Sequence, residues 1–180
     1  MQILKETMII PDSIRDNKYR VSPIGTLFNI QTDRPTRKYN HKMGTFHVGL
    51  KTNDIEGAKT LVNKMEEVQY AFGQQKQQSD KPLLSLPYKI DGEFYNFNPF
   101  RLNSCGWDSK KNNAYVNQPR IFSAENKELD NRLHEFKQAD EHMGRVLYSI
   151  IPYLNQEGIG IVLRLRGIQF QNYIPMHKAS

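Results

Sequence analysis

The sequence predicts a small, mainly β domain that closes into a barrel and carries one inserted helix. Segments with alternating apolar residues occur along most of the chain, and one segment has helical periodicity. The order is strand, strand, helix and then several strands, which is typical of small barrels with an inserted helix. The chain of 180 residues has the usual length of one domain, so we expect residues 1–180 to form a single domain.

Two strand-like segments precede the helix. Tyr19 to Gln31 predicts a first strand that is interrupted at Pro23 and Gly25, because proline in a strand favours an edge or a bulge. A basic loop, TDRPTRKYNHK, is expected next. The segment 44–53 alternates strictly, so its apolar residues share one face of a second strand.

The one clear helix is predicted over about 54–72. Apolar residues recur there at steps of three and four, and the resulting stripe is expected to pack against a sheet. Asn53 is the predicted N-cap, and Glu56 stands three residues later, as in a capping box.

The remaining elements follow the helix in short succession. A glutamine-rich loop leads to the strand EFYNFNPFRL, and NSCGWDSKKNNAYVNQ reads as a long polar loop. A short strand, PRIFS, precedes a second, short helix expected from Glu125 to Phe136. GRVLYSIIPYLN and EGIGIVLRLRGIQFQNY then form a closing hairpin.

The closing strand has two unlike faces. Leu163 and Leu165 share an aliphatic face, whereas Arg164 and Arg166 point to the other side. One interpretation is an ordinary solvated surface, since most surface charge has no further role. The other is a sheet surface that binds a polyanion.

Composition limits the classes of function. The formal charge is +6 with a pI near 9.3, which favours anionic partners without defining a fold. Cys105 is the single cysteine, so an intrachain disulfide cannot form. The N-terminus lacks the pattern of a signal peptide, and no apolar stretch approaches the roughly 20 residues of a membrane helix. We therefore expect a cytoplasmic protein that does not bind membranes.

The sequence lacks the patterns of an enzyme. The five histidines have no metal-ligand spacing, and neither HExxH, CxxC, a phosphate-binding P-loop nor GxGxxG occurs. We therefore expect no catalytic residues, no metal site and no cofactor.

Cations interleaved with aromatic residues favour a nucleic-acid partner. NKYR, RKYNHK, FYNFNPFR, GWDSKKNNAY and GRVLY each place an aromatic residue close to Lys or Arg. Single strands are bound in this way, with cations tracking phosphates and flat side chains stacking on bases. The predicted helix mixes lysines with glutamates, which argues against insertion into a DNA groove.

The chain resembles the phage-type OB-fold single-stranded-DNA-binding proteins over roughly Tyr19 to Tyr173. Three stretches carry the resemblance: FHVGLKTNDIEGAKTLVNKM, GRVLYSIIPYLN and GIGIVLRLRGIQF. It implies a five-stranded barrel that binds single-stranded DNA with little sequence preference during viral DNA replication or recombination. It also implies a location in the host cytoplasm and replication or recombination enzymes as partners. Such proteins often end in an acidic tail that recruits these enzymes, whereas this sequence ends NYIPMHKAS.

The middle strands and their loops are the expected binding surface. We give most weight to Phe97, Phe100, Arg101, Trp107 and Lys110, and less to Arg164 and Arg166. The other candidates are Lys42, Lys51, Lys111, Tyr115, Tyr148 and Tyr153. Two alternatives stay open: a structural or protein-interaction module of a virus, and an RNA-binding protein.

Overall fold

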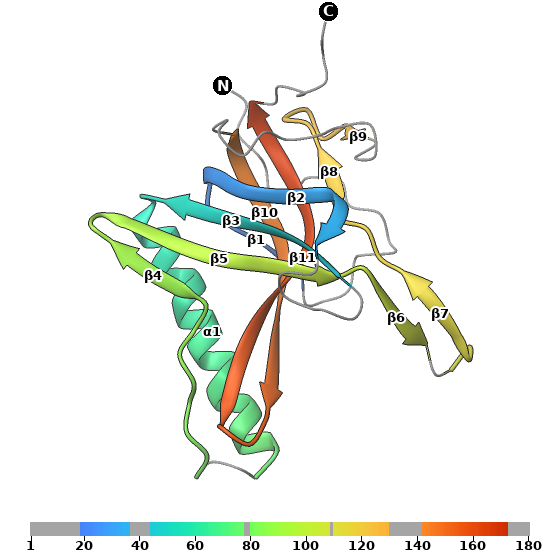
Figure 1. The fold of residues 1–180 in the computed structure, drawn as a ribbon. Helices are drawn as coiled ribbons and strands as arrows, with labels where there is room; N and C mark the ends of the chain where they lie inside the picture. The colour runs from blue at the N-terminus through green and yellow to red at the C-terminus, as the bar shows by residue number, and fades with distance from the viewer. Residues whose placement is uncertain (1–18, 37–43, 78–79, 109, 130–141, 173–180) are drawn as a thin grey trace, which may run out of the picture.

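A computed structural model describes residues 19–36, 44–77, 80–108, 110–129 and 142–172. Five long strands dominate the fold, with one helix beside them (Figure 1). They are β2 (Gly25–Thr36), β3 (Thr45–Thr52), β5 (Phe94–Asn103), β10 (His142–Leu154) and β11 (Ile159–Asn172).

The five strands close on themselves. The order β10-β2-β3-β5 is antiparallel throughout, β11 then joins β5 in parallel, and β10 and β11 pair along nearly their whole length. The result is a mixed five-stranded barrel with one α-helix, similar to an OB-fold. The predicted fold class is confirmed.

Short strands extend or flank the barrel. β1 pairs with β10, β4 with β5 and β8 with β11, while β9 continues the sheet beyond β8. A separate hairpin of β6 and β7 follows β5 and projects away from the barrel (Figure 1). The bounds are β1 (Tyr19–Val21), β4 (Tyr88–Asp91), β6 (Cys105–Asp108), β7 (Asn113–Val116), β8 (Arg120–Phe122) and β9 (Glu128–Leu129).

Helix α1 (Ile55–Gln75) begins almost directly after β3 and lies beneath the barrel, along the lower part of the β10–β11 hairpin (Figure 1). Its N-cap is Asp54, whose Oδ1 accepts a hydrogen bond from the Gly57 N–H at 3.0 Å. The predicted cap, Asn53, was one residue too early. The predicted apolar stripe is buried at Ala58, Leu61, Val62 and Met65. The described part of the chain has no helix long and apolar enough to cross a membrane.

The core fills the barrel interior and the space above α1. Val48, Phe100 and Leu163 lie in adjacent strands at the same level, and all three side chains are fully buried. This row joins β3, β5 and β11, so the core depends on the parallel pairing that closes the barrel.

The second predicted helix is wrong over its first part. Ser123 and Asn126 form a turn, in which the Asn126 N–H donates to the Ser123 carbonyl at 3.0 Å and Asn126 has φ of 67°. Glu128 and Leu129 then pair with β8 as strand β9. Leu129 packs against the barrel core from this strand, so burial is achieved without a helix. Residues 130–136 of the prediction lie outside the described residues.

Two loop predictions also need correction. β2 continues to Thr36, although a loop was expected after Gln31. The expected long loop after β5 contains the β6–β7 hairpin, with Asn112 at its turn in the left-handed region (φ 53°). Asparagine tolerates that conformation better than most residues. The polar residues of this segment therefore suit the turn, while the residues on either side of the turn pair as β6 and β7.

Leu163→Ala should lower the free energy of unfolding by about 2–5 kcal/mol, because it leaves a cavity in the barrel core. Its exposed neighbour provides the control: Arg164→Ala should change stability by no more than about 0.5 kcal/mol. Chemical denaturation of both variants makes the comparison. Equal losses would show that the two faces of β11 have been assigned wrongly.

Candidate nucleic-acid interface

Two arginines from neighbouring strands lie side by side on the outside of the barrel. The parallel pairing of β5 with β11 sets Leu163 opposite Phe100 and Arg164 opposite Arg101. The first pair is buried in the core, so the alternation of strand side chains turns the second pair outward. Arg164 is exposed and Arg101 is half-buried. Among the described residues, neither guanidinium forms an ion pair with a carboxylate.

The same row continues across β3. Arg101 pairs with His47, which in turn pairs with Gln31 of β2. His47 is only 4% exposed, and its Nδ1 lies 2.9 Å from the Asn29 carbonyl oxygen. The imidazole is therefore held against the barrel wall, and the accessible positive charge of this row comes from the two arginines.

An aromatic ring lies farther along the same side. Phe28 of β2 pairs with Gly49 of β3, and its neighbour Leu27 is buried in the core, so Phe28 points outward. The ring rests directly on Gly49, where a Cβ atom would come within 2.4 Å of a ring carbon. Glycine in a strand permits this close approach. The half-buried ring keeps part of its surface open to solvent.

A second aromatic ring lies where β3 ends and β5 begins. Lys51 pairs with Asn96, and its Nζ lies 4.7 Å from the centroid of the Phe94 ring. This is cation–π geometry. Both side chains are half-buried. We call the surface formed by these residues the outer face: Phe28, Lys51, Phe94, Asn96, Arg101 and Arg164.

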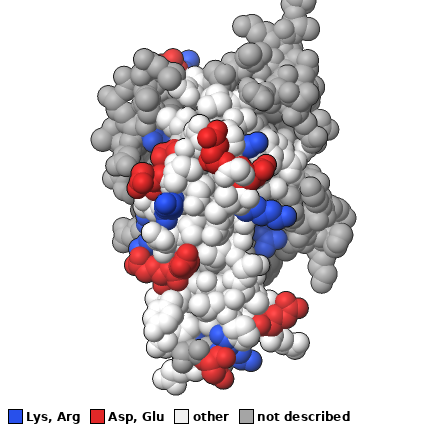
Figure 2. Space-filling model, turned by 90° about the vertical axis from the view of Figure 1, so that its left-hand side faces the viewer, with Lys and Arg blue, Asp and Glu red and all other residues white. Residues whose placement is uncertain are grey.

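The position of the outer face agrees with its chemistry. β3 and β5 are the second and third strands of the barrel, and in OB-folds these strands carry the oligonucleotide-binding surface. The face combines cations with flat rings, as phosphates and bases require. On the side of the molecule that Figure 2 shows, Lys and Arg are interspersed with Asp and Glu. On α1, for example, Lys64 and Glu67 form an ion pair, with 3.2 Å between Nζ and Oε1.

The β6–β7 hairpin is the second place where predicted residues come together. Lys110 and Lys111 are exposed at its turn. Trp107 pairs with Ala114, and Tyr115 pairs with Gly106. The side chains of Trp107 and Tyr115 lie outside the described part of the structure, so their role as stacking surfaces stays a prediction.

Three predicted stacking residues are corrected by the structure. Phe97 and Phe100 are fully buried, and Tyr148 is 2% exposed. The register between β3 and β5 shifts where Leu50 pairs with Phe97 and Val48 with Phe100. One extra residue of β5 is accommodated there, so both phenylalanines face inward although they stand three positions apart. In this structure, none of the three rings can stack on a base.

The remaining predicted site residues that the structure describes do not lie opposite Arg101 or Arg164 in a neighbouring strand. Arg166 is half-buried and its Nε donates to the Ser149 hydroxyl at 3.1 Å. Tyr153 is 37% exposed near the far end of β10, with its ring over Gly160. Lys42 lies outside the described residues. Among the candidates that the structure describes, only Arg101 and Arg164 occupy adjacent positions in neighbouring barrel strands.

Sequence reasoning missed Phe28 and Phe94 as candidates. Phe94 belongs to the aromatic segment FYNFNPFR, in which the sequence predicts Phe97 and Phe100 as the stacking residues. Phe28 precedes Asn29, a residue with φ of 54° that interrupts the regular pairing of β2 with β3. A glycine at an outward position of the next strand, Gly49, was the available signal, because it leaves room for a ring from β2.

No metal site is evident in the parts of the chain that the structure describes, since no group of three His, Cys, Asp or Glu side chains is placed to hold an ion.

Comparison with known proteins finds structures with a similar fold. No known protein family and no curated protein sequence matches the chain. The single-stranded DNA binding protein gp2.5 of bacteriophage T7 has a similar structure, with a TM-score of 0.74 and 16% identity over 91% of this chain and 98% of that chain. The single-stranded DNA-binding protein of bacteriophage Enc34, solved in complex with single-stranded DNA, gives a TM-score of 0.62 and 12% identity over 96% and 99%. At these identities the likeness establishes the fold.

Tyr148 should titrate well above an ordinary tyrosine. Burial raises the pKa of its hydroxyl from 10 to about 12, although the neighbouring Arg20 guanidinium lowers the pKa in part. A raised pKa means that this contribution to stability is complete below pH 10 and is lost as the pH rises through 12. The wild type should therefore lose on the order of 3 kcal/mol more stability than Tyr148→Phe over this interval.

Tyrosinate absorbance and denaturation at several pH values check this expectation. The expectation is contradicted if the titration that Tyr148→Phe removes from the wild-type curve lies near pH 10, because the hydroxyl would then be exposed to solvent.

Proposed function

We propose that the chain binds single-stranded DNA on the outer face with little sequence preference and protects it during viral DNA replication or recombination. The observation that carries the proposal is the Arg101–Arg164 pair on β5 and β11. The likeness to phage proteins that bind single-stranded DNA supports it independently. On this proposal the protein is not an enzyme and acts in the host cytoplasm.

The arginine pair has an electrostatic cost that a polyanion removes. Like charges directly opposite each other on neighbouring strands are destabilising, by roughly 0.2–1 kcal/mol for such cross-strand pairs. No carboxylate among the described residues compensates Arg101 or Arg164. A phosphate placed between two guanidinium groups would turn the repulsion into two charge-assisted contacts.

The aromatic side chains supply the second part of the interaction. Phe28 and Phe94 lie on the same side of the barrel as the arginine pair, one resting on Gly49 and the other beneath Lys51. Bases stacked on such rings are bound regardless of their identity, because every base has an aromatic face. The β6–β7 hairpin, with exposed Lys110 and Lys111, would extend the contact with the backbone.

Oligo-dT should bind tightly and weaken steeply as salt rises. Each phosphate contact releases counterions, with a slope of log affinity against log salt of about −0.7 per contact. A fluorescent dT oligomer titrated with duplex DNA and RNA as competitors measures both affinity and preference. Duplex DNA should compete poorly, because the groove-binding helix is lacking among the described elements.

Two results would redirect the proposal. Absence of binding at physiological salt favours a structural or protein-interaction module. Stronger competition by RNA than by DNA of the same sequence favours an RNA-binding protein that recognises the 2′-hydroxyl.

Arginine and aromatic variants should respond differently to salt. Arg101→Gln and Arg164→Gln should each reduce the salt slope by about 0.7. Phe28→Leu should cost about 1–3 kcal/mol of binding at every salt concentration, because it removes a stacking surface. Equilibrium titrations at several salt concentrations separate the two effects.

The chain offers matched controls for both kinds of variant. Lys127 is an exposed cation in the turn before β9, and Tyr70 is an aromatic residue on α1 with 62% exposure. Lys127→Gln and Tyr70→Leu should bind as the wild type does. If these controls weaken binding as much as the outer-face variants, the outer face is not the binding surface.

A further inference from the structure

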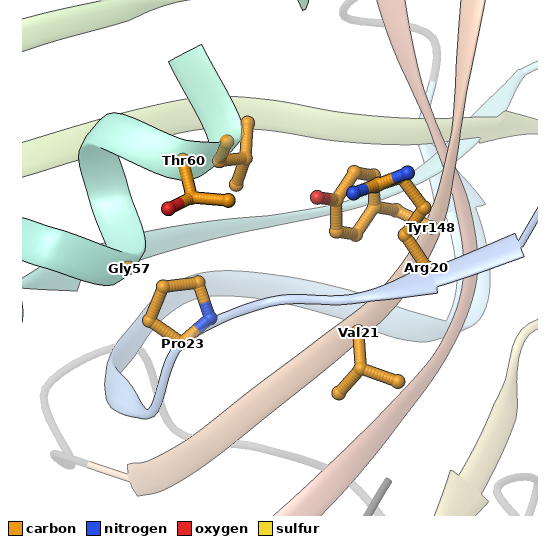
Figure 3. Close-up of a pocket in the computed structure, with 7 residues that line it drawn as sticks. Arg20, Val21, Pro23, Gly57, Thr60 and Tyr148 are labelled. Atoms are coloured by element: carbon orange, nitrogen blue, oxygen red, sulfur yellow. The ribbon is translucent and has the colours of Figure 1, made fainter. Parts of the chain in front are cut away.

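A pocket lies away from the outer face, between β1, the start of α1 and β10 (Figure 3). Its volume is about 340 Å³, and its walls include Arg20, Pro23, Gly57, Thr60 and Tyr148. Arg20 and Tyr148 are register partners in the β1–β10 pair, so their side chains lie next to each other. The pocket therefore combines a cation, a phenol and the first turns of a helix.

Tyr148 and Arg20 both present hydrogen-bond donors to this pocket. The Tyr148 side chain is 2% exposed, its ring packs edge-on against Phe100 at 5.4 Å, and its hydroxyl opens into the pocket. Within the described residues, no group accepts a hydrogen bond from that hydroxyl. The Arg20 guanidinium lies beside it, donates to the same hydroxyl oxygen and has no carboxylate partner in the same part of the chain. The phenolic proton of Tyr148 and the remaining N–H groups of Arg20 can therefore both be donated to a ligand.

The charges around the pocket favour an anion. An adjoining space of about 480 Å³ shares Arg20 and also has Arg145 and Asp54 on its walls. Asp54 is the N-cap of α1 and already accepts from the Gly57 N–H. Arg20 therefore supplies positive charge to both spaces. The positive end of the helix dipole at Gly57 and Thr60 acts in the same direction.

We propose that this pocket binds a phosphate monoester, as carried by a nucleoside monophosphate or by the phosphorylated end of a strand. A monoester has three terminal oxygens, so two can meet the planar fork of Arg20 while the third accepts from Tyr148. A backbone phosphodiester has two such oxygens and a carboxylate has two, so neither satisfies both donors in this way. Tyr148 is a neutral donor at physiological pH, as an ordinary tyrosine is.

The size and the apolar walls agree with a nucleotide. The volume of about 340 Å³ falls within the range of small-molecule sites, which have about 300–1,000 Å³. Val21, Pro23 and Leu61 provide apolar surface next to Arg20, where a sugar or base can pack. The inference does not depend on strand binding at the outer face, because the pocket shares none of its residues.

Calorimetric titration of the full chain tests the site with four probes: inorganic phosphate, dTMP, thymidine and acetate. Phosphate and dTMP should bind saturably, whereas thymidine and acetate should not. Tyr148→Phe keeps the ring and removes the hydroxyl, so it should weaken dTMP binding roughly tenfold to a hundredfold, as expected for a hydrogen bond to a charged group. Arg20→Gln should weaken dTMP binding at least as much.

Controls make the result decisive. Lys127→Gln removes an exposed cation near β9 and should bind dTMP normally. Thermal unfolding shows whether each variant is folded, and Tyr148→Phe carries the test if Arg20→Gln is not. The proposal is overturned if dTMP fails to bind at millimolar concentration, if acetate binds equally well, or if folded Tyr148→Phe binds dTMP like Lys127→Gln.

A final comparison identifies the source of the phosphate. Oligo-dT with a 5′-phosphate should displace dTMP if the pocket holds a strand end, while the same oligomer with a 5′-hydroxyl should not. Displacement by neither oligomer, with dTMP binding intact, assigns the pocket to free nucleotides.

Discussion

The parallel pairing of β5 with β11 is the constraint on which the structure depends. It is the one parallel contact in the five-strand ring, and without it the sheet would be open between these strands. The pairing is short, with two register partners, yet each partner pair serves a different side of the barrel. Leu163 and Phe100 complete the core, and Arg164 and Arg101 meet outside. Closure of the barrel and assembly of the candidate interface are therefore the same event.

The inner and outer residue pairs at this contact have opposite effects on the stability of the barrel. Burial of Leu163 and Phe100 stabilises the closed barrel, with about 1.5–3 kcal/mol typical for a fully buried side chain of this kind. Placing Arg164 next to Arg101 costs some of that stability. Functional surfaces commonly retain such local conflicts, because the residues that suit a ligand do not suit the free protein. The repulsion is small beside the burial, so the barrel can hold the two cations together in the free protein.

Features that depend on the pattern within one strand or helix could be predicted from the sequence, whereas features that depend on the pairing of two strands could not. Alternation within β11 assigned Leu163 inward and Arg164 outward without knowledge of the fold, and the stripe of α1 was equally clear. Phe97 and Phe100 were misjudged because their burial results from a register shift between β3 and β5, which a single strand cannot reveal. Phe28 was missed because its position depends on Gly49 of another strand. The first part of the second predicted helix is wrong because Leu129 reaches the core from a strand paired with β8.

Amide chemical-shift mapping with a short dT oligomer tests the central claim most directly, because it locates the contact without altering the protein. We expect the largest changes in the outer parts of β3, β5 and β11, centred on Arg101 and Arg164, with little change along the exposed side of α1. Changes concentrated on α1 or on β8 and β9, with β5 and β11 unaffected, would contradict the assignment of the outer face.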